Sequence, residues 1–369
     1  MLDLLRLHHF RNYENQDFRF SPGVNVILGK NGQGKTNILE SIYYLALLRS
    51  FRTQKVMELC YFGSQSFTIY GELTSESDRL SLGVSNGDKR RLSVNGVACN
   101  LASNFISRLI CAAFIPEDLN IVKGPPAARR RFLDILLCQL SMDYLHALQA
   151  YTSALHQRNI MLKQPETYSK NSITAYNHVM VKEAVKIELE RRKFTALLNE
   201  AMKHYSDIFL KGEKVFSLKY FSGCTPLLQP VDEMDEASLS EAYRKALDKN
   251  YDYDCRNGST KNGPHRSDFS CLLDNSQLSA FGSEGECRTA AMALKFSSLD
   301  ILYDGVNEKN VVLLVDDVIG ELDKTRRQVF FELLDKAGQV VLACTEIPQE
   351  LKTVNRTFNI ERGKVVSVS

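Results

Sequence analysis

The sequence predicts an α/β body that is interrupted by a mostly helical insertion. Strand-like runs with turn signals fill the first hundred residues, apolar stripes of helical period dominate from about residue 126, and strand-like runs return after residue 268. With 369 residues, two or three domains are expected, or one large domain with an insertion. We therefore expect the α/β body to comprise segments 1–118 and 261–369, and the helical insertion to span 119–260.

Composition and charge exclude several classes of protein. Hydrophobic residues make up 44% of the chain and charged residues 24%, which excludes a fully disordered, collagen-like or coiled-coil protein. The 46 Lys and Arg residues nearly balance the 44 Asp and Glu residues, so only local patches could bind nucleic acid. No apolar run is long enough to span a bilayer, the first residues do not form a signal peptide, and the nine cysteines form no CxxC pair. We expect a cytoplasmic protein with reduced thiols and no membrane contact.

Strands around one helix are expected at the start of the body. A helix is predicted from Ile38 to Ala46, and Asn86-Gly87 and Asn95-Gly96 indicate hairpin turns. Apolar or alternating runs predict strands at 23–28, 66–70, 80–84 and 91–94.

Helical periodicity defines the insertion. A stripe from Leu133 to Leu155 predicts one long helix, and a second stripe from Ile173 to Ile208 predicts another. The break at Lys163-Gln164-Pro165 makes an antiparallel pair of these two helices, and a shorter helix is expected from Leu239 to Leu247. Later strands are predicted at 269–273, 311–315 and 340–343, before a hairpin that joins 357–360 to 364–368.

A phosphate-binding loop is the strongest local motif. Gly29-Lys30-Asn31-Gly32-Gln33-Gly34-Lys35-Thr36 fits G-x-x-x-x-G-K-[ST], follows a predicted strand and opens a predicted helix, which is the context that the motif requires. Backbone N–H groups of the loop and of the helix N-terminus would point at phosphate oxygens. Lys35 would reach the β- and γ-phosphates, and the Thr36 hydroxyl would bind Mg²⁺.

An acidic pair ends the apolar run at 311–315. Asp316 is the candidate Mg²⁺ contact, and Asp317 could polarise the attacking water. The pair lies about 280 residues after the phosphate loop, which is consistent with a large insertion between the two motifs.

A third segment, Phe281 to Arg288, opens a helix with the sequence Ser283-Glu284-Gly285-Glu286. It resembles the signature segment of ABC-type ATPases, in which a serine hydroxyl and helix N-terminal N–H groups hold the γ-phosphate bound to the opposite subunit. Glu321-Leu322-Asp323, just after the acidic strand, lies where such ATPases have a loop that crosses the dimer interface.

The chain as a whole resembles the RecF family of bacterial DNA replication and repair proteins. The resemblance covers essentially the whole chain in order, and it rests on the three motifs above and on segments that generic ABC ATPases do not share: Phe10 to Tyr13, Pro116 to Pro126, Arg129 to Asp134, Gln157 to Asn159 and Gly263 to Asp268. It implies an ABC-type ATPase head, similar to the heads of SMC proteins, with a mixed core sheet, an antiparallel β subdomain and a helical lid.

The resemblance also implies an activity and its partners. We expect a slow ATPase that uses ATP and Mg²⁺, forms a homodimer on ATP, binds double-stranded and gapped DNA, and acts with RecR and RecO to help load RecA. Lys35 and Asp317 are the expected catalytic residues, and Thr36 and Asp316 the metal ligands. The expected ATP-binding residues are Arg11, Gly29, Lys30, Asn31, Gly32, Gln33, Gly34, Lys35, Thr36, Asn37, Ser283, Gly285, Glu286 and Asp323.

Departures from the family pattern and basic clusters leave some roles open. Position 286 is Glu where the family usually has Gln, Ser267 replaces a second Asp after His-Arg, and segment 343–346 lacks a Thr-rich turn. Candidate DNA contacts are Arg129, Arg130 and Arg131, with Lys89 to Arg91 and Arg191 to Lys193 as other clusters. His265-Arg266 could contact nucleotide, DNA or a neighbouring subunit.

Two alternatives belong to other classes. One is a transport-type ABC ATPase, against which the long helical insertion argues. The other is an interaction scaffold that binds ATP without hydrolysing it, against which the intact acidic pair argues.

Overall fold

Two compact units make up the protein. The computed structural model describes residues 1–74, 79–224, 234–306, 311–317 and 322–369. Unit 1 comprises Met1–Asp118 with Leu302–Ser369, and unit 2 comprises Leu119–Ile301. The expected N-terminal segment 1–118 lies within unit 1, and segment 261–301 packs within unit 2.

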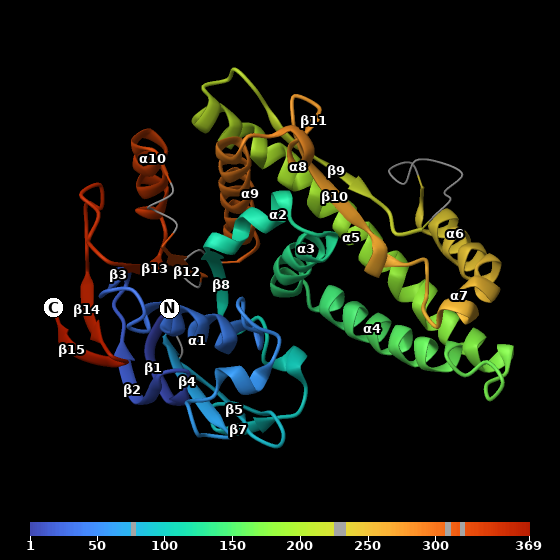
Figure 1. Cartoon of the computed structure of the whole chain (residues 1–369), viewed down its shortest axis with the longest axis horizontal. Helices are drawn as coiled ribbons and strands as arrows, with labels where there is room; N and C mark the ends of the chain where they lie inside the picture. The colour runs from blue at the N-terminus through green and yellow to red at the C-terminus, as the bar shows by residue number, and fades with distance from the viewer. Residues whose placement is uncertain (75–78, 225–233, 307–310, 318–321) are drawn as a thin grey trace. The chain divides into compact units, whose positions relative to one another are not determined.

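Unit 1 contains a mixed core sheet with strand order β15-β14-β3-β13-β12-β8 (Figure 1). All neighbouring strands are parallel except β14 and β15, which form the predicted C-terminal hairpin. The bounds are β3 (Gly23–Leu28), β8 (Ile110–Phe114), β12 (Val311–Asp316), β13 (Gln339–Cys344), β14 (Arg356–Glu361) and β15 (Lys364–Val368). All residues of β8, β12 and β13 are buried, as expected for parallel strands covered on both faces.

A second, antiparallel sheet of unit 1 has the order β2-β1-β4-β5-β6-β7. Its strands are β1 (Leu2–Phe10), β2 (Tyr13–Arg19), β4 (Phe67–Thr74), β5 (Arg79–Asn86), β6 (Arg91–Val94) and β7 (Val97–Cys99). The predicted turn between β6 and β7 is present: Asn95 has φ 52° and Gly96 has φ 75°, the positive values that a two-residue hairpin turn needs. The expected mixed core sheet with an antiparallel β subdomain is therefore confirmed.

The described residues of unit 1 also form the helices α1 (Lys35–Leu47) and α10 (Lys324–Leu334). Nearly all of α1 is buried, and α1 lies against the core-sheet strands β12, β13 and β8. Short 3₁₀ turns among the described residues of unit 1 lie at Val56–Leu59, Ala102–Asn104 and Pro116–Asp118.

Unit 2 is mostly helical (Figure 1). Helices α4 and α5 form the predicted antiparallel pair, and the strand order β11-β10-β9 gives a small antiparallel sheet. The bounds are α2 (Leu119–Lys123), α3 (Pro126–Leu140), α4 (Met142–Leu162), α5 (Lys170–Leu210), β9 (Phe216–Phe221), α6 (Glu236–Lys249), α7 (Tyr251–Asn257), a 3₁₀ turn (Pro264–Arg266), β10 (Asp268–Leu273), β11 (Ser276–Gln277) and α8 (Leu278–Phe281). Helix α9 (Glu284–Gly305) begins in unit 2.

The prediction of one long helix through residues 133–155 is wrong. Ser141 has extended backbone angles (φ −135°, ψ 114°) and separates α3 from α4. Its hydroxyl accepts a hydrogen bond from the Tyr144 N–H, so the serine acts as the N-cap of α4. The apolar spacing continues across the break, which is why periodicity alone did not reveal it. No helix among those described is long and apolar enough to cross a membrane, and none of the nine cysteines, all of which lie in described residues, takes part in a disulfide.

Candidate nucleotide-binding site

The phosphate loop joins β3 to α1 and is shaped by its glycines. Gly32 has φ 78° and Gly34 has φ 109°, conformations that L side chains rarely adopt. The Lys35 ammonium lies back over the loop, where it donates to the carbonyl oxygens of Gly29 at 2.6 Å and Lys30 at 3.0 Å. Burial lowers the pKa of Lys35, while the charges of Asp317, Cys344 and Asp316 oppose this shift.

The turn between β1 and β2 supports the loop. The Asn12 amide donates to the Gln33 carbonyl at 3.0 Å and accepts from the Asn37 amide at 2.8 Å, and the Tyr13 hydroxyl donates to the Gly34 carbonyl at 3.1 Å. A Cβ at Gly34 would lie 2.4 Å from the Asn12 amide nitrogen, so this contact also requires glycine there. Sequence reasoning did not assign this role to Asn12 and Tyr13, which depends on contact between two loops.

Thr36 and Asp316 meet at the carboxyl edge of the core sheet. The Thr36 hydroxyl donates to Asp316 Oδ1 at 3.0 Å, across 280 positions of the chain. Asp316 is 6% exposed, and burial raises its pKa to about 6, although the Thr36 hydrogen bond opposes the shift. A hydroxyl and a carboxylate are the hard oxygen donors that Mg²⁺ prefers, so this pair fits the expected ion.

Asp317 follows directly and is exposed. It adopts φ 47°, a left-handed conformation that is uncommon outside glycine. The negative charge of Asp317 raises the pKa of both Lys35 and Asp316, so Asp317 interacts electrostatically with both residues of the site.

Arg11 lies in a buried ion pair. Its guanidinium forms a two-point contact with Glu40, at 2.8 and 2.7 Å, and donates to the Glu58 carbonyl at 2.7 Å. The Glu40 side chain is fully buried, so Arg11 neutralises a carboxylate inside unit 1. The structure thus gives Arg11 a structural partner, and a role in binding ATP stays a prediction.

The signature segment of unit 2 begins α9 with a capping box. The Ser283 hydroxyl accepts from the Glu286 N–H at 3.2 Å, while Glu286 Oε2 accepts from the Ser283 N–H and hydroxyl, each at 2.9 Å. Lys214 pairs with the other Glu286 oxygen at 3.2 Å. The Glu286 carboxylate therefore occupies the Ser283 donors that are expected to hold a γ-phosphate, a use that the motif did not reveal.

Asp323 is the N-terminal cap of α10. Its carboxylate accepts from the Arg326 N–H at 2.9 Å and pairs with the Arg326 guanidinium at 2.9 Å. Glu321, the other acid of this loop, lies outside the described residues.

The basic clusters divide sharply between core and surface. Arg129 is buried and makes a two-point ion pair with Asp268 at 2.6 and 2.9 Å, and Arg191 is buried against Asp134 at 2.6 Å. The structure thus gives both side chains internal acid partners, so neither is a free surface charge for DNA. Arg130 donates to the Ser267 carbonyl at 2.9 Å and, like Arg131, is partly exposed. The turn residues Lys89 to Arg91 are exposed.

The fold and the site together define a class of protein. It is a nucleotide-binding head in which a phosphate loop (P-loop) lies next to a buried strand that ends in an acidic residue, here β12 with Asp316. The family model described as "RecF/RecN/SMC N terminal domain" matches residues 1–364. The DNA replication and repair protein RecF of Clostridium tetani is 34% identical, over 98% of each chain, and that of an Exiguobacterium species is 33% identical, over 100% of this chain and 99% of its own. A solved structure of the recombination mediator protein RecF with ATP, in the RecFOR pathway, superposes with a TM-score of 0.90 at 27% identity and covers 99% of this chain and 96% of its own.

The chain therefore belongs to the RecF family of DNA replication and repair proteins. The head domain of an Smc protein from Pyrococcus furiosus, with a TM-score of 0.54 at 12% identity, shares the fold.

Proposed function

We propose that the protein is an ATP-driven switch on DNA in recombinational repair. The observation that carries the proposal is the 3.0 Å contact between Thr36 and Asp316, which joins an intact phosphate loop to an intact acidic strand. Lys35 and the N–H groups of 29–34 bind the phosphates, and Thr36 and Asp316 hold Mg²⁺. Bound Mg²⁺ supplies positive charge that offsets the negative charge of the phosphates. Asp317 orients and deprotonates the attacking water, and turnover is slow.

The proposed active state is a homodimer with two bound ATP molecules. Each phosphate loop faces the signature segment of the other copy, where Ser283, Gly285 and the N-terminus of α9 bind the γ-phosphate. A Cβ at Gly285 would meet nothing within 4 Å, so this part of the segment is open. In the dimer the Ser283 donors leave Glu286 and turn to the phosphate.

The proposed partners follow from the family. The protein would bind double-stranded and gapped DNA as a dimer, and would act in the cytoplasm with RecR and RecO to help load RecA. Support comes from the relatives named as DNA replication and repair proteins and from the solved relative named in the RecFOR pathway.

Sedimentation with and without ATP tests the switch. We expect dimers only when ATP and Mg²⁺ are present, and we expect Lys35→Ala to stay monomeric. DNA affinity should follow the dimer population. A protein that stays monomeric with ATP and binds DNA regardless of nucleotide contradicts the switch.

ATP hydrolysis separates the switch from an ATP-binding scaffold. Asp317→Asn should still dimerise on ATP but lose most of its ATPase activity, by about 100-fold or more, because the positioned base is gone. If the wild-type protein dimerises but hydrolyses no ATP on any DNA, the scaffold is the better description.

A further inference from the structure

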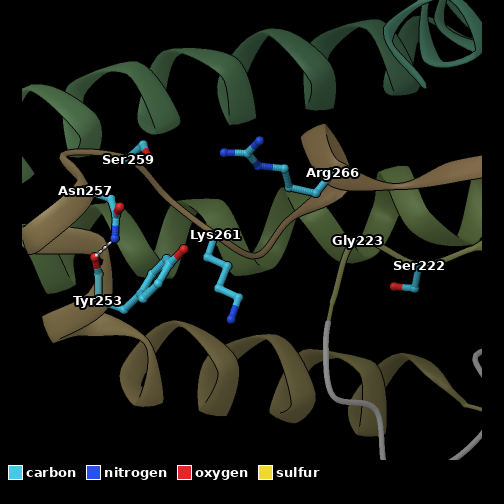
Figure 2. A pocket seen from close by; sticks show the side chains of 7 residues that line it. All are labelled: Ser222, Gly223, Tyr253, Asn257, Ser259, Lys261 and Arg266. Atoms are coloured by element: carbon cyan, nitrogen blue, oxygen red, sulfur yellow. Dashed lines mark hydrogen bonds between the residues drawn. The ribbon is translucent and has the colours of Figure 1, made fainter. Parts of the chain in front are cut away.

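A polar cavity in unit 2 lies apart from every residue assigned above to ATP. Its volume is about 380 Å³, within the range of roughly 300–1,000 Å³ that small-molecule sites occupy. Its lining consists of Ser222, Gly223, Tyr253, Asn257, Ser259, Lys261 and Arg266 (Figure 2). It thus includes Arg266 of the His-Arg pair, for which the sequence left three roles open.

Two cations of this cavity make no ion pair with the part of the chain that the structure describes. Both Lys261 and Arg266 are exposed, and no carboxylate of the described residues lies within 4.0 Å of either charge. The Lys261 ammonium lies over the Tyr253 ring, 4.8 Å from its centroid, and Arg266 makes one long hydrogen bond, 3.4 Å, to the Thr260 carbonyl. The cavity therefore offers two positive charges that form no ion pair within the described ranges, a setting that attracts an anion.

The backbone that carries these cations, residues 258–268, is held by buried polar contacts. His265 Nε2 lies 3.0 Å from the Thr260 carbonyl and Nδ1 lies 2.6 Å from the Tyr151 hydroxyl. The carbonyl must accept, so Nε2 carries the proton and Nδ1 accepts from tyrosine. Arg191 donates to the Pro264 carbonyl at 2.7 Å, and Arg158 donates to the Thr260 hydroxyl at 2.6 Å.

A close backbone contact between Gly223 and Gly263 holds the side of the cavity that Gly223 lines. The Gly263 N–H donates to the Gly223 carbonyl at 2.9 Å, and a Cβ on Gly223 would lie 1.9 Å from the Gly263 carbonyl oxygen. Gly263 has φ 149°, and a Cβ there would lie 1.9 Å from the Tyr151 hydroxyl oxygen, so both positions require glycine. This frame fixes the backbone positions of Lys261 and Arg266 before a ligand arrives, which lowers the entropy that the backbone loses on binding.

An aromatic face completes the lining. Tyr253 is 44% exposed, and its backbone carbonyl accepts from the Asn257 side-chain amide at 2.7 Å, a contact between two residues of α7 (Figure 2). An exposed ring beside two unpaired cations suits a ligand that has both a flat base and a phosphate. A duplex hides the faces of its bases, whereas an unpaired strand exposes them.

We propose that this cavity binds one nucleotide unit of an unpaired nucleic-acid strand. Lys261 and Arg266 hold the phosphate, Tyr253 stacks on the base, and the Ser259 hydroxyl faces the sugar and phosphate. The proposed function enters this proposal at one point only: it identifies the unpaired strand as the single-stranded part of gapped DNA.

Fluorescence anisotropy with a short labelled oligo-dT and the full chain tests the site. Tyr253→Leu should weaken binding by about 5- to 100-fold, as expected when one stacked base is lost. Arg266→Gln and Lys261→Gln should each weaken it and lower the slope of log affinity against log salt by about 0.7. Lys249→Gln removes the same charge from the exposed end of α6 and should change neither quantity.

Three results would overturn the proposal. The first is that the cavity variants behave like Lys249→Gln. The second is that AMP binds at Lys261 and Arg266 as tightly as the oligonucleotide, which makes a free nucleotide the ligand. The third is that inorganic phosphate competes fully while Tyr253→Leu has no effect, which leaves an anion site without a base. Measurements on Lys35→Ala keep the two proposals apart: if oligonucleotide binding still depends on Tyr253 but ATP never drives dimerisation, the switch fails and this site stands.

Discussion

At the scale of single residues, Glu286 shows how one side chain can oppose the proposed chemistry. Its carboxylate takes the Ser283 N–H and hydroxyl, and Lys214 holds it from the other side. Hydrogen bonds from Ser283 and Lys214 lower the pKa of Glu286, so it is ionised at neutral pH. A γ-phosphate that approaches Ser283 would meet this negative charge.

Substitution of Glu286 should therefore strengthen the ATP-bound dimer. Glu286→Gln keeps an oxygen that can accept from Ser283 but removes the charge. We expect the dimer dissociation constant with ATP to fall about 25-fold, because the dimer has two such sites and each contributes roughly 1 kcal/mol for unit charges about 4 Å apart in water. Sedimentation at several protein concentrations measures it. Glu284→Gln removes an exposed acid two positions away and is the control; an equal effect of both variants would show that only net charge matters.

At the scale of elements, buried polar contacts of Arg158 join α4 to α5 and α7. Arg158 on α4 donates to Asp254 on α7 at 2.8 Å and to Asn177 on α5 at 2.8 Å. The Arg158 and Asp254 side chains are both fully buried. Removal of one partner leaves an uncompensated charge in a low-dielectric interior.

Loss of Arg158 should destabilise unit 2 strongly. Arg158→Met should lower the free energy of unfolding by about 3–5 kcal/mol, because Asp254 stays buried without its partner. The double variant Arg158→Met with Asp254→Asn should recover part of the loss. Urea unfolding followed by circular dichroism measures both. Arg244→Met breaks exposed ion pairs on α6 and should change stability by less than about 1 kcal/mol; a similar small loss at Arg158 would contradict the account.

His265 should make stability depend on pH. Burial lowers its pKa to about 4, and the charges of Arg266, Arg130 and Arg158 act in the same direction. The unfolded chain, with an ordinary pKa near 6.5, then binds more protons between these values, so stability is full above about pH 6.5 and falls toward pH 4. The loss attributable to this group is about 3 kcal/mol.

Thermal unfolding from pH 4.5 to 7.5 isolates this contribution. In the variant His265→Gln, the new amide can still accept from Tyr151 and donate to the Thr260 carbonyl, but it does not titrate. The variant should lose less stability than wild type as the pH falls. His146→Gln changes an exposed histidine on α4 and should follow the wild-type curve. Identical curves for all three proteins would show that His265 protonates as readily in the fold as outside it.

At the scale of the whole molecule, the two units divide the proposed work. The phosphate loop and the acidic strand both lie in unit 1, whereas the signature segment and the proposed strand site lie in unit 2. A ligand that binds at the phosphate loop therefore stabilises unit 1 directly.

ATP should raise the stability of unit 1 by mass action. At a concentration of Mg²⁺-ATP about 100 times its dissociation constant, the expected gain is about 2.7 kcal/mol. Differential scanning calorimetry should show the shift in the wild type and in Lys89→Ala, whose lysine lies in an exposed turn, and not in Lys35→Ala. An unchanged thermogram with ATP would argue against nucleotide binding at this loop.

The sequence alone determined the features that depend on neighbouring residues. The phosphate loop needs glycines, a strand before it and a helix after it, and all three are local. The alternation of strands, the buried run before Asp316 and most helix bounds follow in the same way from short-range periodicity. Because the carboxyl ends of β3 and β12 lie at one edge of a parallel sheet, the meeting of Thr36 with Asp316 could also be expected.

Only the tertiary structure decided which charges are free. Arg129, Arg191, Lys261 and Arg266 all look like surface cations in the sequence, yet the first two meet Asp268 and Asp134, across 139 and 57 positions of the chain. Lys261 and Arg266 meet no described carboxylate within 4.0 Å. The same limit hid the break at Ser141 and the support of the phosphate loop by Asn12. A side chain's charge is set by its type, but whether that charge is neutralised depends on long-range packing, which no local pattern encodes.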